Sequence, residues 1–230
     1  MILMLALLQQ FSDLLFPPKC IFCGCLLVTH SDLNICDICY NKIPFNEEDI
    51  IFAPGSGEST GCDGAICVCR YSGIIKDSLI RFKFYNKPGY YRTFANLLHS
   101  RIIKVTDSGK FDMVISVPLH KHKEFSRGYN QAYLISRALS REINLPECSF
   151  LLKRIRNTNA QSLLDRENRQ ENIRDAFKVT NYEKVKDKSI LLIDDILTTG
   201  CTIDECSRML KEAGVKSVTA AVVATGRKYY

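Results

Sequence analysis

The chain has 230 residues, of which 46% are hydrophobic and 24% are charged, and its formal net charge is +6. These values are ordinary for a soluble globular protein, and they exclude a chain that is disordered or of low complexity as a whole. Residues 1–60 hold two Lys and seven Asp or Glu, so the whole positive excess lies in the rest of the chain. That basic part is expected to face phosphates, nucleic acid or an acidic surface, although scattered solvated lysines give the same count.

Residues 1–17 are mostly apolar and predict an amphipathic helix, which Pro17 and Pro18 stop. We expect this helix to dock on the body of the protein, with contact to a membrane surface as an alternative. No apolar run approaches the roughly 20 residues needed to cross a bilayer, so an integral membrane protein is not expected. The segment lacks the basic start and the cleavage site of a signal peptide, so a cytoplasmic location is expected.

The eleven cysteines are an odd number without an export signal, which favours reduced thiols over a disulfide framework. Four of them form a C-x2-C-x12-C-x2-C pattern at Cys20, Cys23, Cys36 and Cys39. Two such turns complete a tetrahedron of thiolates around a structural zinc ion. We therefore assign residues 18–64 to a small zinc-binding module and linker, whose folding energy comes from the metal. Gly24 follows the first pair, where such a turn favours a residue that tolerates positive φ.

Three further cysteines follow the linker, and two interpretations of them stay open. Cys62, Cys67 and Cys69 are either buried cysteines in and beside a strand or ligands of a second metal site.

From residue 65 to residue 230 apolar strands alternate with amphipathic helices. Strands are expected at 66–71, 113–117, 189–193 and 218–224, and helices at 74–83, 90–104, 132–142 and 202–213. We expect Thr202 and Glu205 to form a capping box for the last helix and Gly214 to end it. This alternation is typical of an α/β domain, a mostly parallel sheet with helices on both faces. Such sheets bind ligands beyond the carboxyl ends of their strands.

The stretch from Ile190 to Thr202 carries the clearest chemical signal. Four apolar residues form a buried strand, Asp194 and Asp195 follow, and a loop of small hydroxyl residues and Gly leads into a helix. Backbone amides at a helix N-terminus are suited to phosphate, and paired carboxylates suit sugar hydroxyls and magnesium. The alternatives are a plain helix cap and the Walker B strand of an NTPase, but the G-x-x-x-x-G-K-[ST] partner of the latter is missing. The stretch therefore predicts a site for a phosphorylated sugar.

All thirteen positions of this stretch fit the signature with which type I phosphoribosyltransferases bind 5-phosphoribosyl diphosphate (PRPP). The chain also resembles the ComF family, which comprises the ComF and ComFC competence proteins and GntX-like relatives, from Leu14 onward. The resemblance is carried by the four-cysteine pattern, Tyr71-Ser72-Gly73, Lys83-Phe84, Val117-Pro118-Leu119, Arg127-Gly128-Tyr129-Asn130-Gln131 and Lys153-Arg154 followed by Gln161. It implies a type I phosphoribosyltransferase fold at 65–230, a parallel sheet flanked by helices, behind a small N-terminal zinc module.

The resemblance also implies roles for individual residues. Asp194 and Asp195 are expected to hold the ribose hydroxyls, directly or through magnesium, and to serve as the catalytic pair. The rest of the expected PRPP-binding set is Thr198, Thr199, Gly200, Cys201 and Thr202 at the 5-phosphate, Leu119, His120 and Lys121 at the pyrophosphate, and Arg127 and Lys83. A mobile loop over the active site is expected to carry Lys153, Arg154 and Arg156.

In this superfamily a nitrogen nucleophile displaces pyrophosphate from C1 of the ribose, so the resemblance implies a glycosyltransferase with magnesium and structural zinc as cofactors. One alternative is a regulatory module that binds PRPP or a nucleotide without transferring anything. Another is a metabolic phosphoribosyltransferase that acts on an unidentified nitrogen base.

The resemblance further implies a part in natural transformation, in which the protein handles single-stranded DNA at the cytoplasmic side with partners such as a helicase. Through those partners it would associate with the membrane. Residues 71–110 carry eight Lys or Arg against two Asp, with aromatic residues interspersed at Tyr71, Phe82, Phe84, Tyr85, Tyr90 and Tyr91. Basic and aromatic side chains together are typical of single-strand binding, although aromatic residues at helical spacing also form cores.

Overall fold

The computed structural model describes residues 17–27, 33–47, 61–157 and 171–226. The expected N-terminal helix, much of the linker and Gln161 lie outside the described residues. Within those ranges, no helix combines the length and the apolar character needed to cross a membrane.

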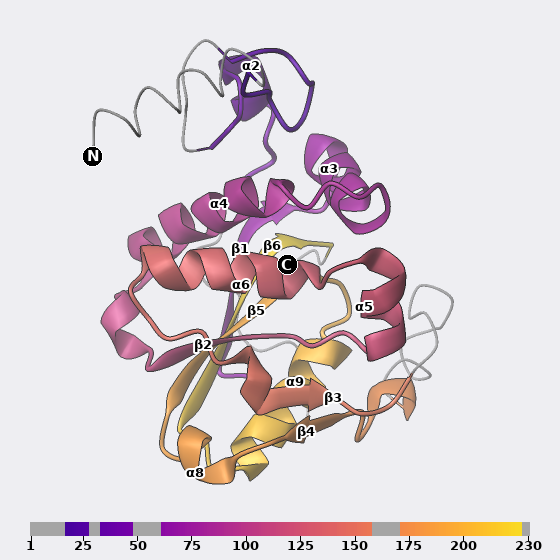
Figure 1. Cartoon of the computed structure of the whole chain (residues 1–230). Coiled ribbons are helices and arrows are strands. Elements are labelled where there is room, and N and C mark those ends of the chain that lie inside the picture. Colours follow the sequence, from indigo (N-terminus) through magenta and orange to yellow (C-terminus); the bar gives the residue numbers. More distant parts are fainter. Residues whose placement is uncertain (1–16, 28–32, 48–60, 158–170, 227–230) are drawn as a thin grey trace, which may run out of the picture.

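A four-stranded parallel sheet forms the centre of the protein, with the strand order β1-β6-β5-β2 (Figure 1). The strands are β1 (Gly64–Arg70), β2 (Met113–Ser116), β5 (Ser189–Leu197) and β6 (Ser217–Thr225). This confirms the expected parallel sheet. Strand β5 extends beyond the predicted end at residue 193, because Asp194 to Leu197 keep their pairing with β6. The two neighbouring carboxylates therefore belong to the strand itself.

Two hydrophobic clusters pack on the two faces of the sheet, and the side chains of β5 alternate between them. Leu191 and Ile193 join the first cluster, while Ile190 and Leu192 join the second. The first face is covered by α3 (Gly73–Phe84), α4 (Tyr90–Val105) and α6 (Gln131–Glu142). The second is covered by α9 (Cys201–Glu212) and by an antiparallel pair, β3 (Leu152–Arg154) and β4 (Phe177–Val179). The short elements are α2 (Asp37–Tyr40), η1 (Ser108–Lys110), α5 (Lys121–Arg127), η2 (Ser149–Leu151) and α8 (Tyr182–Val185).

The predicted capping box at the start of α9 is wrong. The N-cap is Gly200, which offers no side-chain cap. The Glu205 carboxylate is engaged elsewhere, because it accepts from the backbone amide of Asp175 at 2.6 Å and from the Arg208 guanidinium at 2.7 Å. Neither Thr202 nor Glu205 caps this helix, and Gly200 and Thr202 line a cavity instead.

The four-cysteine module packs onto α3 and α4, and its apolar residues belong to the same cluster as the core of those helices (Figure 1). Two side chains of the helices hold its backbone: Arg81 donates to the carbonyl of Phe22 at 3.1 Å, and Thr93 donates to that of Leu33 at 2.7 Å. The beginning of the expected linker is also fixed, since Phe45 forms an antiparallel bridge with Cys69 of β1. That pairing covers an edge strand that would otherwise expose its backbone groups.

Candidate active site

A cavity of about 710 Å³ lies at the carboxyl ends of β2 and β5, the edge at which a parallel sheet is expected to bind ligands. Most of the residues predicted to bind PRPP line it. They are Lys83, Leu119, Arg127, Asp194, Asp195, Thr198, Thr199, Gly200 and Thr202. Residues from four separate stretches of the chain thus meet in one place.

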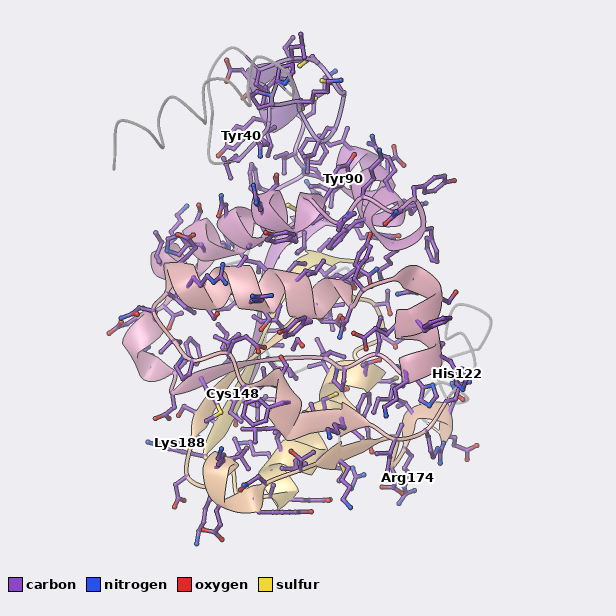
Figure 2. The ribbon with its side chains drawn as sticks, in the orientation of Figure 1. Tyr40, Tyr90, His122, Cys148, Arg174 and Lys188 are labelled. Carbon is purple, nitrogen blue, oxygen red and sulfur yellow. The ribbon has the colours of Figure 1, made fainter. Side chains whose placement is uncertain are left out.

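Three members of the predicted PRPP set do not line the cavity. Cys201 is buried at the start of α9. His120 is the N-cap of α5, where its ring accepts from the amide of His122 at 3.4 Å, and Lys121 is the first residue of that helix. The His122 side chain lies at the outer surface beside α5 (Figure 2). The chain thus turns into α5 directly after Leu119, so only Leu119 of that predicted loop reaches the cavity.

The residues expected on the mobile loop are also separated. Lys153 and Arg154 lie in strand β3, and only Arg154 lines the cavity, because neighbouring strand residues point to opposite sides. Arg156 is exposed and donates to the carbonyl of Asn172 at 3.1 Å.

Asp194 and Asp195 line the same cavity but have different neighbours. Asp195 is 5% exposed, and its carboxylate pairs with the Lys83 ammonium of α3 at 2.9 Å. Asp194 accepts from the backbone amide of Asp195 at 2.8 Å and lies within electrostatic reach of Arg154. Burial and the adjacent Asp195 charge raise the pKa of Asp194 from its ordinary value of 3.8 to about 7, against the effect of Lys83. At neutral pH the cavity therefore holds one carboxylate paired with a cation and one that titrates.

Three basic side chains line the same cavity, and we define Lys123, Arg127 and Arg154 together as the basic wall. Burial and the charges of the two arginines lower the pKa of Lys123. Burial likewise lowers the pKa of Arg154. Like charges kept this close together favour binding of an anion with several negative oxygens.

Sequence reasoning missed several cavity residues. Lys123 lies two residues after Lys121, the last residue of that stretch in the expected binding set. Phe84, Asn130 and Gln131 lie in motifs of which only Lys83 and Arg127 were expected to bind PRPP. The motifs themselves were the available signal. Which of their members face the cavity depends on how α5 and α6 meet.

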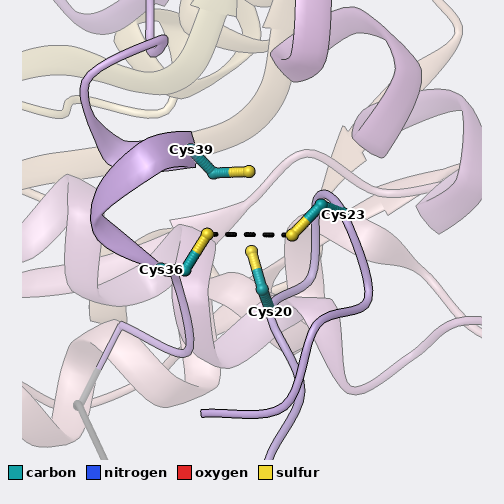
Figure 3. A group of neighbouring side chains, drawn as sticks. All are labelled: Cys20, Cys23, Cys36 and Cys39. Atoms are coloured by element: carbon teal, nitrogen blue, oxygen red, sulfur yellow. Dashed lines mark hydrogen bonds between the residues drawn. The ribbon is translucent and has the colours of Figure 1, made fainter.

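The four cysteines of the predicted module point toward one another (Figure 3). The sulfur atoms of Cys20, Cys23, Cys36 and Cys39 all lie within 4.8 Å of one another, and those of Cys23 and Cys36 are 3.7 Å apart. Tetrahedral zinc–thiolate bonds of about 2.3 Å place sulfur atoms roughly 3.8 Å apart, so this donor set fits such an ion. A backbone hydrogen bond from Cys25 lowers the pKa of Cys23 to about 6, which favours the thiolate that a metal binds.

Cys62, Cys67 and Cys69 are buried. Across the described ranges, the four cysteines of the module form the only group of cysteine, histidine and acidic residues arranged to hold a metal ion. The interpretation as buried thiols is therefore the one that fits these three residues.

The raised pKa of Asp194 predicts a specific pH dependence of stability. Between about pH 4 and pH 7 the unfolded chain carries this aspartate ionised while the folded protein keeps it protonated, so its contribution to stability is lost as pH rises through this range. Asp194→Asn removes that loss. The free energy of unfolding of Asp194→Asn minus that of wild type, both measured in urea titrations, should increase from pH 4 to pH 7 by on the order of 1–3 kcal/mol and then level off.

The control is Asp77→Asn, on the exposed face of α3, for which the difference from wild type should stay flat over the same range. A flat difference for Asp194→Asn as well would contradict the raised pKa of this carboxyl group.

Comparison with known proteins identifies relatives of this chain. The family pattern described as "Phosphoribosyl transferase domain" matches residues 127–230, which include Arg127 and Arg154 of the basic wall and both carboxylates. Among solved structures, a purine phosphoribosyltransferase from Pyrococcus horikoshii is matched with a TM-score of 0.35 and 16% identity, over 60% of this chain and 75% of that one.

The similar curated proteins are named as competence proteins or DNA utilization proteins. Competence protein F of Haemophilus influenzae is 32% identical over 160 residues, which are 68% of this chain and 70% of that protein. Competence protein ComFC of Bacillus subtilis is 31% identical over 147 residues, or 64% of this chain and 58% of that protein. The DNA utilization protein YhgH of Escherichia coli is 24% identical over 84% of this chain and 85% of its own length. With its four-cysteine cluster, its parallel sheet and its phosphoribosyltransferase domain, the chain belongs to the ComF family.

Proposed function

We propose that the cavity binds PRPP together with magnesium and that the protein is a phosphoribosyltransferase that acts in natural transformation at the cytoplasmic side of the membrane. The observation that carries the proposal is the meeting, in one cavity, of two carboxylates, a helix N-terminus without a side-chain cap, and a basic wall. These three elements match the ribose hydroxyls, the 5-phosphate and the pyrophosphate of that ligand.

In this proposal different residues bind different parts of the ligand. The amides of the loop Thr198–Thr202 hold the 5-phosphate at the start of α9. Asp194 and Asp195 hold the ribose hydroxyls, and magnesium, when bound with the ligand, neutralises charge on the pyrophosphate. The basic wall stabilises the charge that develops on the departing pyrophosphate. Lys83, whose ammonium pairs with Asp195 at 2.9 Å, would exchange that carboxylate for a ligand oxygen.

A module that binds PRPP without transferring its ribose is the second reading of the same cavity. The two differ in one measurable product, because only a transferase releases pyrophosphate when a nitrogen base is added. The four-cysteine module plays no chemical part in either case. We propose that it holds structural zinc, which stabilises the module packed on α3 and α4.

The PRPP site predicts that binding depends on both carboxylates. In calorimetric titrations with magnesium present, the double variant Asp194→Asn with Asp195→Asn should bind PRPP at least about tenfold more weakly than wild type, because charge-assisted contacts to ribose and metal are lost. Asp77→Asn, which removes an exposed carboxylate elsewhere, should bind like wild type. Equal affinity in the double variant and wild type would reject this site.

The zinc site predicts one zinc ion per chain, measured by elemental analysis of the purified protein. Cys23→Ser should lower the zinc content and the thermal unfolding temperature together, since the metal supplies folding energy to the module. The matched control is Cys25→Ser, an exposed cysteine two residues away that is outside the four-sulfur cluster. The assignment fails if Cys25→Ser loses zinc and Cys23→Ser keeps it.

We also propose that the rim of the cavity handles single-stranded DNA, in line with the names of the similar proteins. Of the aromatic residues that suggested this role, Phe82 is buried and Tyr71, Tyr90 and Tyr91 pack against the core. Phe84 and Tyr85 at the end of α3 are instead 65% exposed, beside a cavity with a basic wall. An exposed aromatic residue near basic groups offers a stacking platform for a base.

Removal of this platform should weaken binding of single-stranded DNA. Tyr85→Ala is expected to lower the affinity roughly 5-fold to 100-fold, as the loss of one stacked base does. The control Tyr182→Ala removes a comparably exposed tyrosine from α8 and should have no effect. The proposal fails if wild-type affinity is insensitive to added salt or if both variants bind equally well.

A further inference from the structure

The junction between α5 and α6 is held rigidly at the cavity. Arg127 ends α5, and Gly128 adopts a φ of 81°, a left-handed conformation that turns the chain toward α6. The Tyr129 hydroxyl donates to the carbonyl of Phe82 in α3. Asn130 donates to the carbonyl of Val117 after β2 at 3.1 Å and caps α6. The junction is thereby fixed to two different elements of the fold.

This turn brings the Arg127 guanidinium against two uncharged side chains. It donates to the Gln131 side-chain carbonyl at 3.2 Å, and it lies over the Phe84 ring, 5.2 Å from the ring centre. Gln131 is only 2% exposed, so its amide has little freedom to turn away. Both partners fix the guanidinium at the cavity wall.

No carboxylate of the described residues lies within ion-pair distance of Arg127. The contrast within the same protein is Arg208, which pairs with the carboxylates of Asp175, Glu205 and Glu212. Lys83 in the cavity is likewise neutralised, by Asp195. Arg127 is held by a hydrogen bond and a ring contact, and no carboxylate of the described residues compensates its positive charge.

We propose that Gln131 and Phe84 are positioning residues, which hold the Arg127 guanidinium ready for an oxyanion of the ligand without neutralising it. The inference rests on the proposed function and deepens it, because the oxyanion belongs to the pyrophosphate group of PRPP. A side chain that is already ordered loses less conformational entropy when the ligand binds. A carboxylate in place of the Gln131 amide would order Arg127 equally well but would cancel the charge that the ligand needs.

The decisive variant is therefore Gln131→Glu, which is nearly the same size and keeps an acceptor for Arg127. Binding of PRPP, inorganic pyrophosphate and ribose 5-phosphate is measured by calorimetry with magnesium present. Gln131→Glu should weaken PRPP and pyrophosphate at least about tenfold and leave ribose 5-phosphate within about twofold, because that ligand lacks the pyrophosphate. Gln131→Met and Phe84→Leu, which loosen Arg127 but keep its charge, should give smaller losses with the same ligand pattern.

Two controls match these changes away from the cavity. Asn181→Asp adds one negative charge at the N-cap of α8, and Phe150→Leu removes a ring that lies under the Lys184 ammonium. Both should bind all three ligands like wild type. The inference is overturned if Gln131→Glu binds pyrophosphate as tightly as Asn181→Asp does, or if it loses ribose 5-phosphate to the same extent. Failure of wild type to bind any of the three ligands would instead overturn the proposed function itself, and this inference with it.

Discussion

The adjacent carboxylates of Asp194 and Asp195 lie near the carboxyl end of strand β5. Two charges at this place carry a desolvation cost that neighbouring residues must offset. Lys83 offsets the charge of Asp195, and it reaches it from the last turn of α3. The residues before it in that turn have other tasks, since Phe82 fills the core and Arg81 holds the backbone of the cysteine module. Three consecutive residues thus join the module, the core and the cavity. A disturbance of the module is expected to reach the cavity through this turn.

The negative and the positive side chains of the cavity have different kinds of partner. Among the carboxylates, Asp195 has Lys83 as a counterion, whereas Arg127 of the basic wall is held by uncharged groups. The α9 N-terminus supplies a third binding element that takes no side-chain cap. If Arg127 binds the ligand as we propose, the positive excess of the chain beyond residue 60 includes at least one charge with a binding role, in addition to the lysines on the solvated surface.

Sequence patterns predicted the sheet well because its strands are apolar runs and its helices are strongly periodic, which are local properties. The capping box failed because Glu205 is engaged by Asp175, thirty residues earlier in the chain, and no local pattern records such a contact. The family resemblance implied His120 and Lys121 at the pyrophosphate, but α5 begins there and neither residue lines the cavity. The role of Gln131 depends on how two helices meet, so it needed the structure.

The central claim is that PRPP lies across the carboxyl ends of β2 and β5 in a defined direction. A crystal structure of the protein with PRPP and magnesium tests it most directly. The account predicts the 5-phosphate at the amides of Thr198–Thr202, the ribose hydroxyls at Asp194 and Asp195, and the pyrophosphate beside Arg127. Density for PRPP in the opposite direction, or outside this cavity, would contradict it.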